Sequence, residues 1–225
     1  MKRTTSLLKI KPHLAQKQAV INSSSYRGDS GYTLIELLVV TIILGILAAI
    51  AAPGWLGFVS QRRVSAANEV VLRGLQEAQN LAKSRKLSYS VAFGEKDGVP
   101  AIAVYQTTTT PSDAEWRSLS KDLALKPGQV VLGSNLADGD SQSPGSRPSF
   151  GNLSPTTDNL ALKKRVTFDN FGALYGGDSS PPATDLTIAV AASNGNSPIE
   201  STMRCVKVKS LLGALKTGKG AECNQ

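Results

Sequence analysis

The stretch from Thr33 to Ala52 most constrains what this chain can fold into, because its 20 residues carry one charge, that of Glu36. At 1.5 Å per residue, a helix of this length spans roughly 30 Å, which is the thickness of a bilayer's hydrocarbon core. The sequence therefore predicts a single membrane-spanning helix over about 33–53. A carboxylate inside such a helix costs about 2.5–3.5 kcal/mol on insertion scales, so Glu36 is a candidate functional residue that needs a compensating partner.

Positive charge is concentrated ahead of this apolar segment. The chain has a net charge of +8, and residues 1–31 contain six basic residues against one acidic residue. Basic residues on one side of a membrane span place that side in the cytoplasm, so the remainder of the chain is predicted to lie outside. Residues 1–31 contain no apolar core and no small-x-small cleavage site, so we interpret them as a leader that differs from an ordinary secretory signal.

The segment that follows Pro53–Gly54 has the period of a helix. Apolar residues recur every three or four positions from residue 55 to about residue 86, which predicts an amphipathic segment that packs on a sheet. This segment continues the membrane-spanning one, so a single long helix is expected over 32–86. This predicted stripe consists of Val64, Ala67, Val71, Leu75, Ala78 and Ala82.

Beyond residue 86 the pattern changes to short alternating segments. Residues 88–93 place Tyr89, Val91 and Phe93 on one face of a strand, and 95–98 reads as a turn. Further strands are expected within 101–106, 116–119, 126–132, 165–168, 186–191 and 203–208, and residues 211–216 lead into the last strand. Residues 135–159 are rich in Ser, Gly, Pro, Asp and Asn, and we interpret them as a flexible insertion. The predicted fold class is α+β, with the long helix packed on an antiparallel β-sheet domain over 87–225.

The junction between leader and apolar segment carries a specific pattern. Gly31 is followed by Tyr32-Thr33-Leu34-Ile35-Glu36 and then by the apolar run. This resembles the N-terminal signature of type IV prepilins and pseudopilins, in which Phe usually stands where this chain has Tyr32. The resemblance implies that a prepilin peptidase cleaves after Gly31 and that Tyr32 is then N-methylated. It also implies that Glu36 pairs with the N-terminal amine of a neighbouring subunit. The alternative is a plain signal anchor in which Glu36 snorkels to the interface.

The downstream pattern resembles the GspH/FimT branch of minor pilins and pseudopilins. That branch has a Trp followed by a Gly-Val strand, a Phe-x-x-x-Gly turn, and a closing strand pair joined through Leu-Gly. The corresponding residues are Trp116 with 128–130, the turn 168–172, and Leu212-Gly213. The resemblance implies a structural subunit anchored by a single pass in the inner membrane of a bacterium, which assembles with other pilins or pseudopilins.

The two cysteines, Cys205 and Cys223, lie in the segment expected to be outside the cytoplasm, where disulfides persist. A bond between them would stabilise the fold by roughly 3 kcal/mol in the chain-entropy model and would secure the C-terminal strand. Two free thiols or an intermolecular bond are the alternatives.

Enzymatic chemistry is not expected. The only histidine, His13, would be removed with the leader, which leaves no imidazole for a Ser-His-Asp or Cys-His arrangement. No glycine-rich phosphate loop precedes a helix, and no metal-ligand cluster is evident. We therefore expect no cofactor, no metal and no catalytic residue, although a hydrolase that needs no histidine remains a distant alternative.

The C-terminal segment 204–225 is basic. Some FimT-like pilins bind DNA through a C-terminal Gly-Arg-x-Arg or Gly-Arg-x-Lys element, and the corresponding 213–216 segment here lacks the first Arg. Lys216, helped by Lys219, is the candidate DNA contact, and a solvated strand face is the alternative. Three functions stay open: a minor pilin of a type IV pilus, a GspH-like pseudopilin of a type II secretion system, and a DNA-binding pilin for natural transformation.

Overall fold

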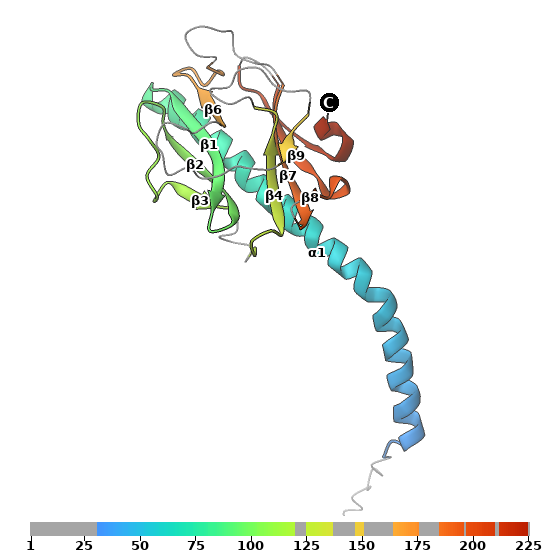
Figure 1. Ribbon diagram of the computed structural model, residues 1–225. Helices are drawn as coiled ribbons and strands as arrows, with labels where there is room; N and C mark the ends of the chain where they lie inside the picture. The colour runs from blue at the N-terminus through green and yellow to red at the C-terminus, as the bar shows by residue number, and fades with distance from the viewer. Residues whose placement is uncertain are drawn as a thin grey trace, which may run out of the picture. The chain divides into compact units, whose positions relative to one another are not determined.

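The computed structural model describes residues 31–119, 125–136, 147–150, 164–175, 185–195, 197–209 and 212–224. The chain divides into two compact units, Met1–Leu47 and Ala48–Gln225. The described part of the first unit is the beginning of the long helix α1. The second unit holds the rest of α1 and a β domain built on it (Figure 1).

Helix α1 runs without interruption from Leu34 to Arg85, so it continues through Pro53–Gly54. It ends where Lys86 takes a positive φ of 57°, because a left-handed residue cannot extend an α-helix. Lys83 and Arg85 lie in the last turn, where positive side chains interact favourably with the helix dipole.

The strands form two antiparallel sheets. The four-stranded sheet has the order β3–β2–β1–β6, with β1 Tyr89–Lys96, β2 Val99–Gln106, β3 Trp116–Ser118 and β6 Arg165–Phe168. The other sheet has the order β10–β9–β7–β4–β5, with β4 Val130–Ser134, β5 Ser149–Phe150, β7 Leu186–Asn194, β9 Arg204–Val208 and β10 Leu215–Lys219. The short strand β8 (Ser197–Pro198) pairs with β7, and the 3₁₀ turns η1 (Glu200–Thr202) and η2 (Gly220–Asn224) complete the described elements.

The hairpin β1–β2 shows why its sequence turns there. Lys96 pairs with Val99, so Asp97 and Gly98 form a two-residue loop. Both loop residues have positive φ, 55° and 74°, as the hairpin turn that matches strand twist requires. The Asp-Gly pair is the residue combination that adopts this turn most readily, in agreement with the turn predicted at 95–98.

One hydrophobic core joins α1 to both sheets. All six residues of the predicted helical stripe are fully buried, and they pack with Tyr89, Val91 and Phe93 of β1 and with apolar residues of β7 and β9. Gly74 of α1 allows a close approach, because a Cβ there would lie 2.5 Å from Ile102 Cδ1. The predicted α+β class, a long helix packed on antiparallel β structure, is confirmed.

The prediction of a flexible insertion over 135–159 is wrong at two places, Asn135 and residues 149–150. Asn135 is buried: its side-chain oxygen accepts from the Thr187 amide at 2.7 Å, and its side-chain nitrogen donates to the Asp185 carbonyl at 3.1 Å. Residues 149–150 form β5 on β4. Such a two-residue strand depends on its partner and leaves no alternation to detect. Residues 137–146 and 151–159 lie outside the described part.

The predicted disulfide is present. Cys205 of β9 is bonded to Cys223 of η2, with a Cα–Cα distance of 5.7 Å. The bond lies on the sheet face opposite α1, where it packs with Met203, Ala189 and Ala191 and is flanked by Phe150. It therefore holds the C-terminal turn against the sheet.

A single side-chain amide connects α1 to turns of both sheets. Gln79 Nε2 donates to the Gly172 carbonyl at 2.8 Å and to the Gly213 carbonyl at 3.2 Å. Gly172 follows β6 in one sheet, and Gly213 precedes β10 in the other. Both glycines have positive φ, and a Cβ on Gly213 would lie 2.8 Å from the Gly172 oxygen. Glycine is therefore required where the two turns meet over the helix.

We expect Gln79→Ala to destabilise the protein by about 1–3 kcal/mol, because it leaves part-buried carbonyls of two turns without their donor. The measurement is urea unfolding of the full-length protein in detergent. Gln76→Ala is the matched control, since Gln76 is exposed one turn earlier on the same helix. Equal unfolding midpoints for the two variants would contradict this role of Gln79.

Candidate processing and assembly site

The predicted cleavage site lies immediately before α1. Gly31, Tyr32 and Thr33 precede the helix, and Tyr32 is 83% exposed. Thr33 caps the helix: its Oγ1 accepts from the Glu36 amide at 3.2 Å, and its carbonyl accepts from the Leu37 amide at 3.2 Å. A Thr followed three residues later by Glu is a helix-capping pattern. The peptide bond between Gly31 and Tyr32 is thus in exposed chain directly before a defined helix start.

Glu36 lies in the first turn of α1, and its side chain is exposed. Negative charge is favourable there, because the unpaired amides of the first turn carry partial positive charge. This local reason for a Glu at position 36 is readable in the sequence as the Thr-x-x-Glu spacing, a signal additional to the resemblance. Within the described residues, no ion pair involves Glu36. A group outside the described chain would have to compensate the carboxylate in an apolar setting.

The helix that carries Glu36 is long and apolar enough to cross a membrane by length and composition. Its most apolar 18-residue window has a mean hydropathy of 2.8, and none of that window is buried. A core helix of a soluble domain would bury such a window, whereas here the apolar side chains from Leu34 to Ile50 are exposed. The N-terminal half of α1 therefore presents apolar surface on all its sides.

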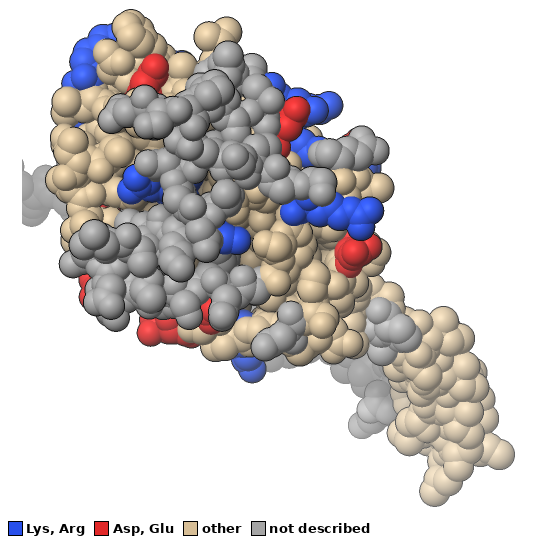
Figure 2. Space-filling view, turned by 45° about the horizontal axis from the view of Figure 1, so that its top comes forward, with Lys and Arg blue, Asp and Glu red and all other residues tan. Residues whose placement is uncertain are grey.

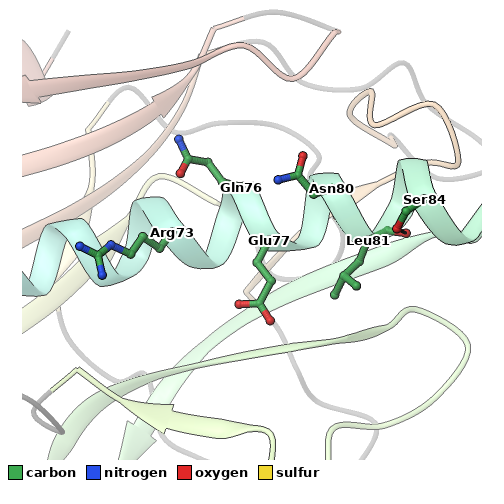
Figure 3. A pocket seen from close by; sticks show the side chains of 6 residues that line it. All are labelled: Arg73, Gln76, Glu77, Asn80, Leu81 and Ser84. Carbon is green, nitrogen blue, oxygen red and sulfur yellow. Dashed lines mark hydrogen bonds between the residues drawn. The ribbon is translucent and has the colours of Figure 1, made fainter.

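The C-terminal half of α1 lines a shallow hollow instead. Six residues line a shallow hollow of about 480 Å³: Arg73, Gln76, Glu77, Asn80, Leu81 and Ser84. Figure 3 shows Gln76 and Asn80 on one side of the helix and Glu77 on the other. Arg117 of β3 donates to Glu77 at 2.7 Å, which ties this face to the four-stranded sheet. The only carboxylate in the lining is thus engaged in an ion pair.

The structure separates the two candidate DNA contacts. Lys216 and Lys219 are three residues apart in β10, so they point to opposite faces of the strand. Lys216 pairs with Lys207 in register, whereas Lys219 pairs with Arg204. Strand register therefore does not bring Lys216 and Lys219 together on one face, and the DNA contact stays a prediction.

Lys216 instead belongs to a cluster with Lys207 and Lys209. The three lysines line a hollow of about 150 Å³ together with Thr217, Gly218 and Glu222. Lys209 also lies 3.4 Å from a carboxylate oxygen of Asp185. In Figure 2, Lys and Arg side chains form small groups on the visible face, several with an acidic side chain nearby. Cross-strand register, which pairs Lys216 with Lys207, defines the cluster.

Lys207 is the unusual member of this lysine cluster because it is buried, with 6% of its surface exposed. Burial lowers the pKa of Lys207, since removal from water disfavours the charged ammonium, and the charge of Lys209 lowers it further. The carboxylates of Asp185 and Glu222 oppose this effect, and Lys216 adds to it.

Comparison with known proteins bears on the N-terminal segment. Residues 26–52 match the prokaryotic N-terminal methylation motif. The chain is 45% identical over 110 residues to the type IV major pilin protein PilA of Myxococcus xanthus, an alignment that covers 48% of this chain and 49% of PilA. It is 33% identical over 100 residues to the type II secretion system core protein G of Pseudomonas aeruginosa, covering 44% of this chain and 65% of that protein.

The similarity to solved structures is weaker. The type IV minor pilin FimU of Pseudomonas aeruginosa aligns with 73% of this chain and 94% of its own, at 15% identity and a TM-score of 0.43, which is too low to establish a common fold. The alignments span about half the length of PilA and 65% of the length of core protein G. The Gly31–Glu36 spacing, the apolar helix and the matched methylation motif agree with one another, and the chain is similar in its sequence to type IV pilins and to a type II secretion core protein.

The buried ammonium predicts a pH dependence of stability. Because the folded-state pKa of Lys207 lies below its unfolded value of 10.5, the unfolded chain binds more protons between those two pKa values. The unfolding free energy of the wild type should therefore rise with pH across that window, relative to Lys207→Met.

The measurement is urea unfolding of both proteins from neutral pH to pH near 10. Both cysteines are in the disulfide, so no thiol titrates or exchanges in this range. Lys126→Met, at an exposed turn before β4, controls for the change in net charge. A constant difference between wild type and Lys207→Met across the range would contradict the lowered pKa.

Proposed function

We propose that this protein is a minor structural subunit of a type IV pilus, of the GspH/FimT-like branch, and that it has no enzymatic activity. The observation that carries the proposal is the accessible Gly31–Tyr32 bond directly before a Thr33-capped apolar helix with Glu36 in its first turn. A prepilin peptidase removes residues 1–31 and Tyr32 is N-methylated. The helix holds the subunit in the inner membrane with the β domain outside.

Assembly then depends on Glu36. Leader removal creates an amine at Tyr32, and the amine of a neighbouring subunit provides the positive charge that the Glu36 carboxylate requires in an apolar environment. The exposed apolar surface of the N-terminal half of α1 packs beside the same surface of other pilins. A position at or near the tip fits a subunit present in few copies.

Two alternatives rest on specific observations. The 33% identity to core protein G favours a pseudopilin role in a type II secretion system. The cluster of Lys207, Lys209 and Lys216 favours DNA binding during uptake, because phosphate contacts need grouped cations and no fixed sequence. Glu222 and Asp185 beside that cluster reduce its net charge, which makes this the weaker alternative.

Deletion of the gene tests the proposed role directly. We expect a strain without it to show few or no surface pili by electron microscopy, and a plasmid copy to restore them. Normal pilus numbers would contradict the pilus role. Export and transformation assays on the same strain would then distinguish a role in secretion from a role in DNA uptake.

The pairing of Glu36 is tested in the complemented strain. Glu36→Gln should be processed normally, since the cleaved bond precedes the helix, but should be nearly absent from sheared pili. The loss leaves a buried amine without its partner, at a cost of about 3–5 kcal/mol. Immunoblots of membrane and sheared fractions provide the measurement. Glu69→Gln, on the exposed face of α1, is the charge-matched control, and wild-type incorporation of Glu36→Gln would disprove the pairing.

A further inference from the structure

A small aromatic and basic cluster follows the apolar segment of α1. The rings of Trp55 and Phe58 have centroids 5.9 Å apart, and the guanidinium carbon of Arg62 lies 5.0 Å from the centroid of the Phe58 ring. Trp55 is 67% exposed and Phe58 is 48% exposed. Two large aromatic rings and an arginine are thus held together on the surface of the helix.

This cluster is on the face of α1 that points away from the β domain. Trp55, Phe58 and Arg62 are spaced by three and four residues, so they share one helix face. Val64, the first fully buried residue of the core stripe, is nine residues after Trp55, which is a rotation of about 180° at 3.6 residues per turn. Packing on the sheets therefore cannot explain the cluster.

Position along the helix indicates what the cluster contacts. Trp55 is 21 residues after Leu34, a rise of roughly 32 Å, which equals the hydrocarbon thickness of a bilayer. The Arg62 guanidinium lies over the Phe58 ring, and Phe58 is 24 residues after Leu34, roughly 36 Å of helix, which is in the head-group layer by the same measure. Trp is enriched at the boundary between membrane and water, and an arginine beside such a ring can keep its stem on apolar surface while its guanidinium lies among the head groups.

The absence of negative charge near Arg62 in the sequence indicates what Arg62 binds. No acidic residue occurs between Leu37 and Asn68, so the chain itself offers Arg62 no carboxylate within its stretch of helix. A guanidinium stacked on an aromatic face keeps the donors at its edge available, and their planar arrangement matches a phosphate. An anionic lipid head group supplies that phosphate at the depth where Arg62 lies.

We propose that Trp55, Phe58 and Arg62 form an interfacial anchor for phospholipid head groups, with Arg62 on a lipid phosphate at the outer surface of the membrane. The proposal rests on the membrane insertion given under the proposed function. The anchor sets the depth of the unassembled subunit, because it places the aromatic rings at the boundary while Glu36 stays near the opposite surface.

The test uses the full-length protein in vesicles of phosphatidylcholine and phosphatidylglycerol. Trp116→Phe leaves Trp55 as the only tryptophan, so its fluorescence can be followed alone. If the Trp116→Phe variant is unstable, the fluorescence of Trp55 is obtained by subtracting that of Trp55→Phe from that of the wild type. Lipids brominated near the head group should quench Trp55 more strongly than lipids brominated near the chain end. Brominated phosphatidylglycerol should quench about fivefold more effectively than brominated phosphatidylcholine at the same fraction, which corresponds to one arginine at an anionic surface.

Arg62→Gln should remove the preference for phosphatidylglycerol and leave the quenching by phosphatidylcholine. Arg73→Gln is the matched control, because Arg73 is on the same helix face, 11 residues beyond Arg62; it should behave as wild type. An unchanged lipid preference in Arg62→Gln would overturn the phosphate contact. Strongest quenching by the deep label, or no quenching in protein that floats with the vesicles, would overturn the interfacial position.

Two further outcomes distinguish the lipid contact from self-association and from a failure of membrane insertion. Shielding of Trp55 that disappears when the protein is diluted in excess lipid would show that a second copy covers the cluster, and would overturn the lipid contact. Protein that fails to float with vesicles would contradict membrane insertion, and with it the proposed function as well as the anchor.

Discussion

The fold depends on how α1 is held against two sheets at once. Its apolar stripe supplies the buried area, but an apolar stripe alone would allow the sheets to slide along the helix. The Gln79 amide removes that freedom, because it binds the carbonyl of Gly172 from one sheet and that of Gly213 from the other. Two glycine turns that are far apart in sequence are thereby brought into contact over one helical residue.

Much of the fold could be predicted because its signals are local. The three- and four-residue spacing of the stripe identified six positions that are all fully buried, and alternation identified the core face of β1. The strands that escaped prediction, β5 and β8, have two residues each and exist through pairing with β4 and β7. Nothing within two residues distinguishes such a strand from a loop.

The candidate sites divide in the same way. The spacing from Gly31 to Glu36 lies within one helical turn and its preceding residues, so the sequence contains the whole arrangement. The lysine cluster does not, because Lys207 and Lys216 meet only through the register of β9 and β10. Proximity in sequence suggested Lys216 with Lys219, and strand alternation places these two side chains on opposite faces. Burial of Lys207 is likewise a tertiary property.

The two ends of the apolar segment have opposite requirements, and this has a consequence for assembly. In a lone subunit, Glu36 can stay near one membrane surface while Arg62 reaches phosphate at the other, so the helix is matched to the bilayer at both ends. Transfer into a fibre removes both aqueous surfaces together. The Arg62 face then loses its lipid phosphate, and the carboxylate of Glu36 loses water. In the proposed assembly, a neighbour's amine at Glu36 compensates one of these losses, and helix-to-helix packing of the exposed apolar surface compensates the other. If both proposals hold, extraction from the membrane is favourable only when a neighbouring subunit is already in register.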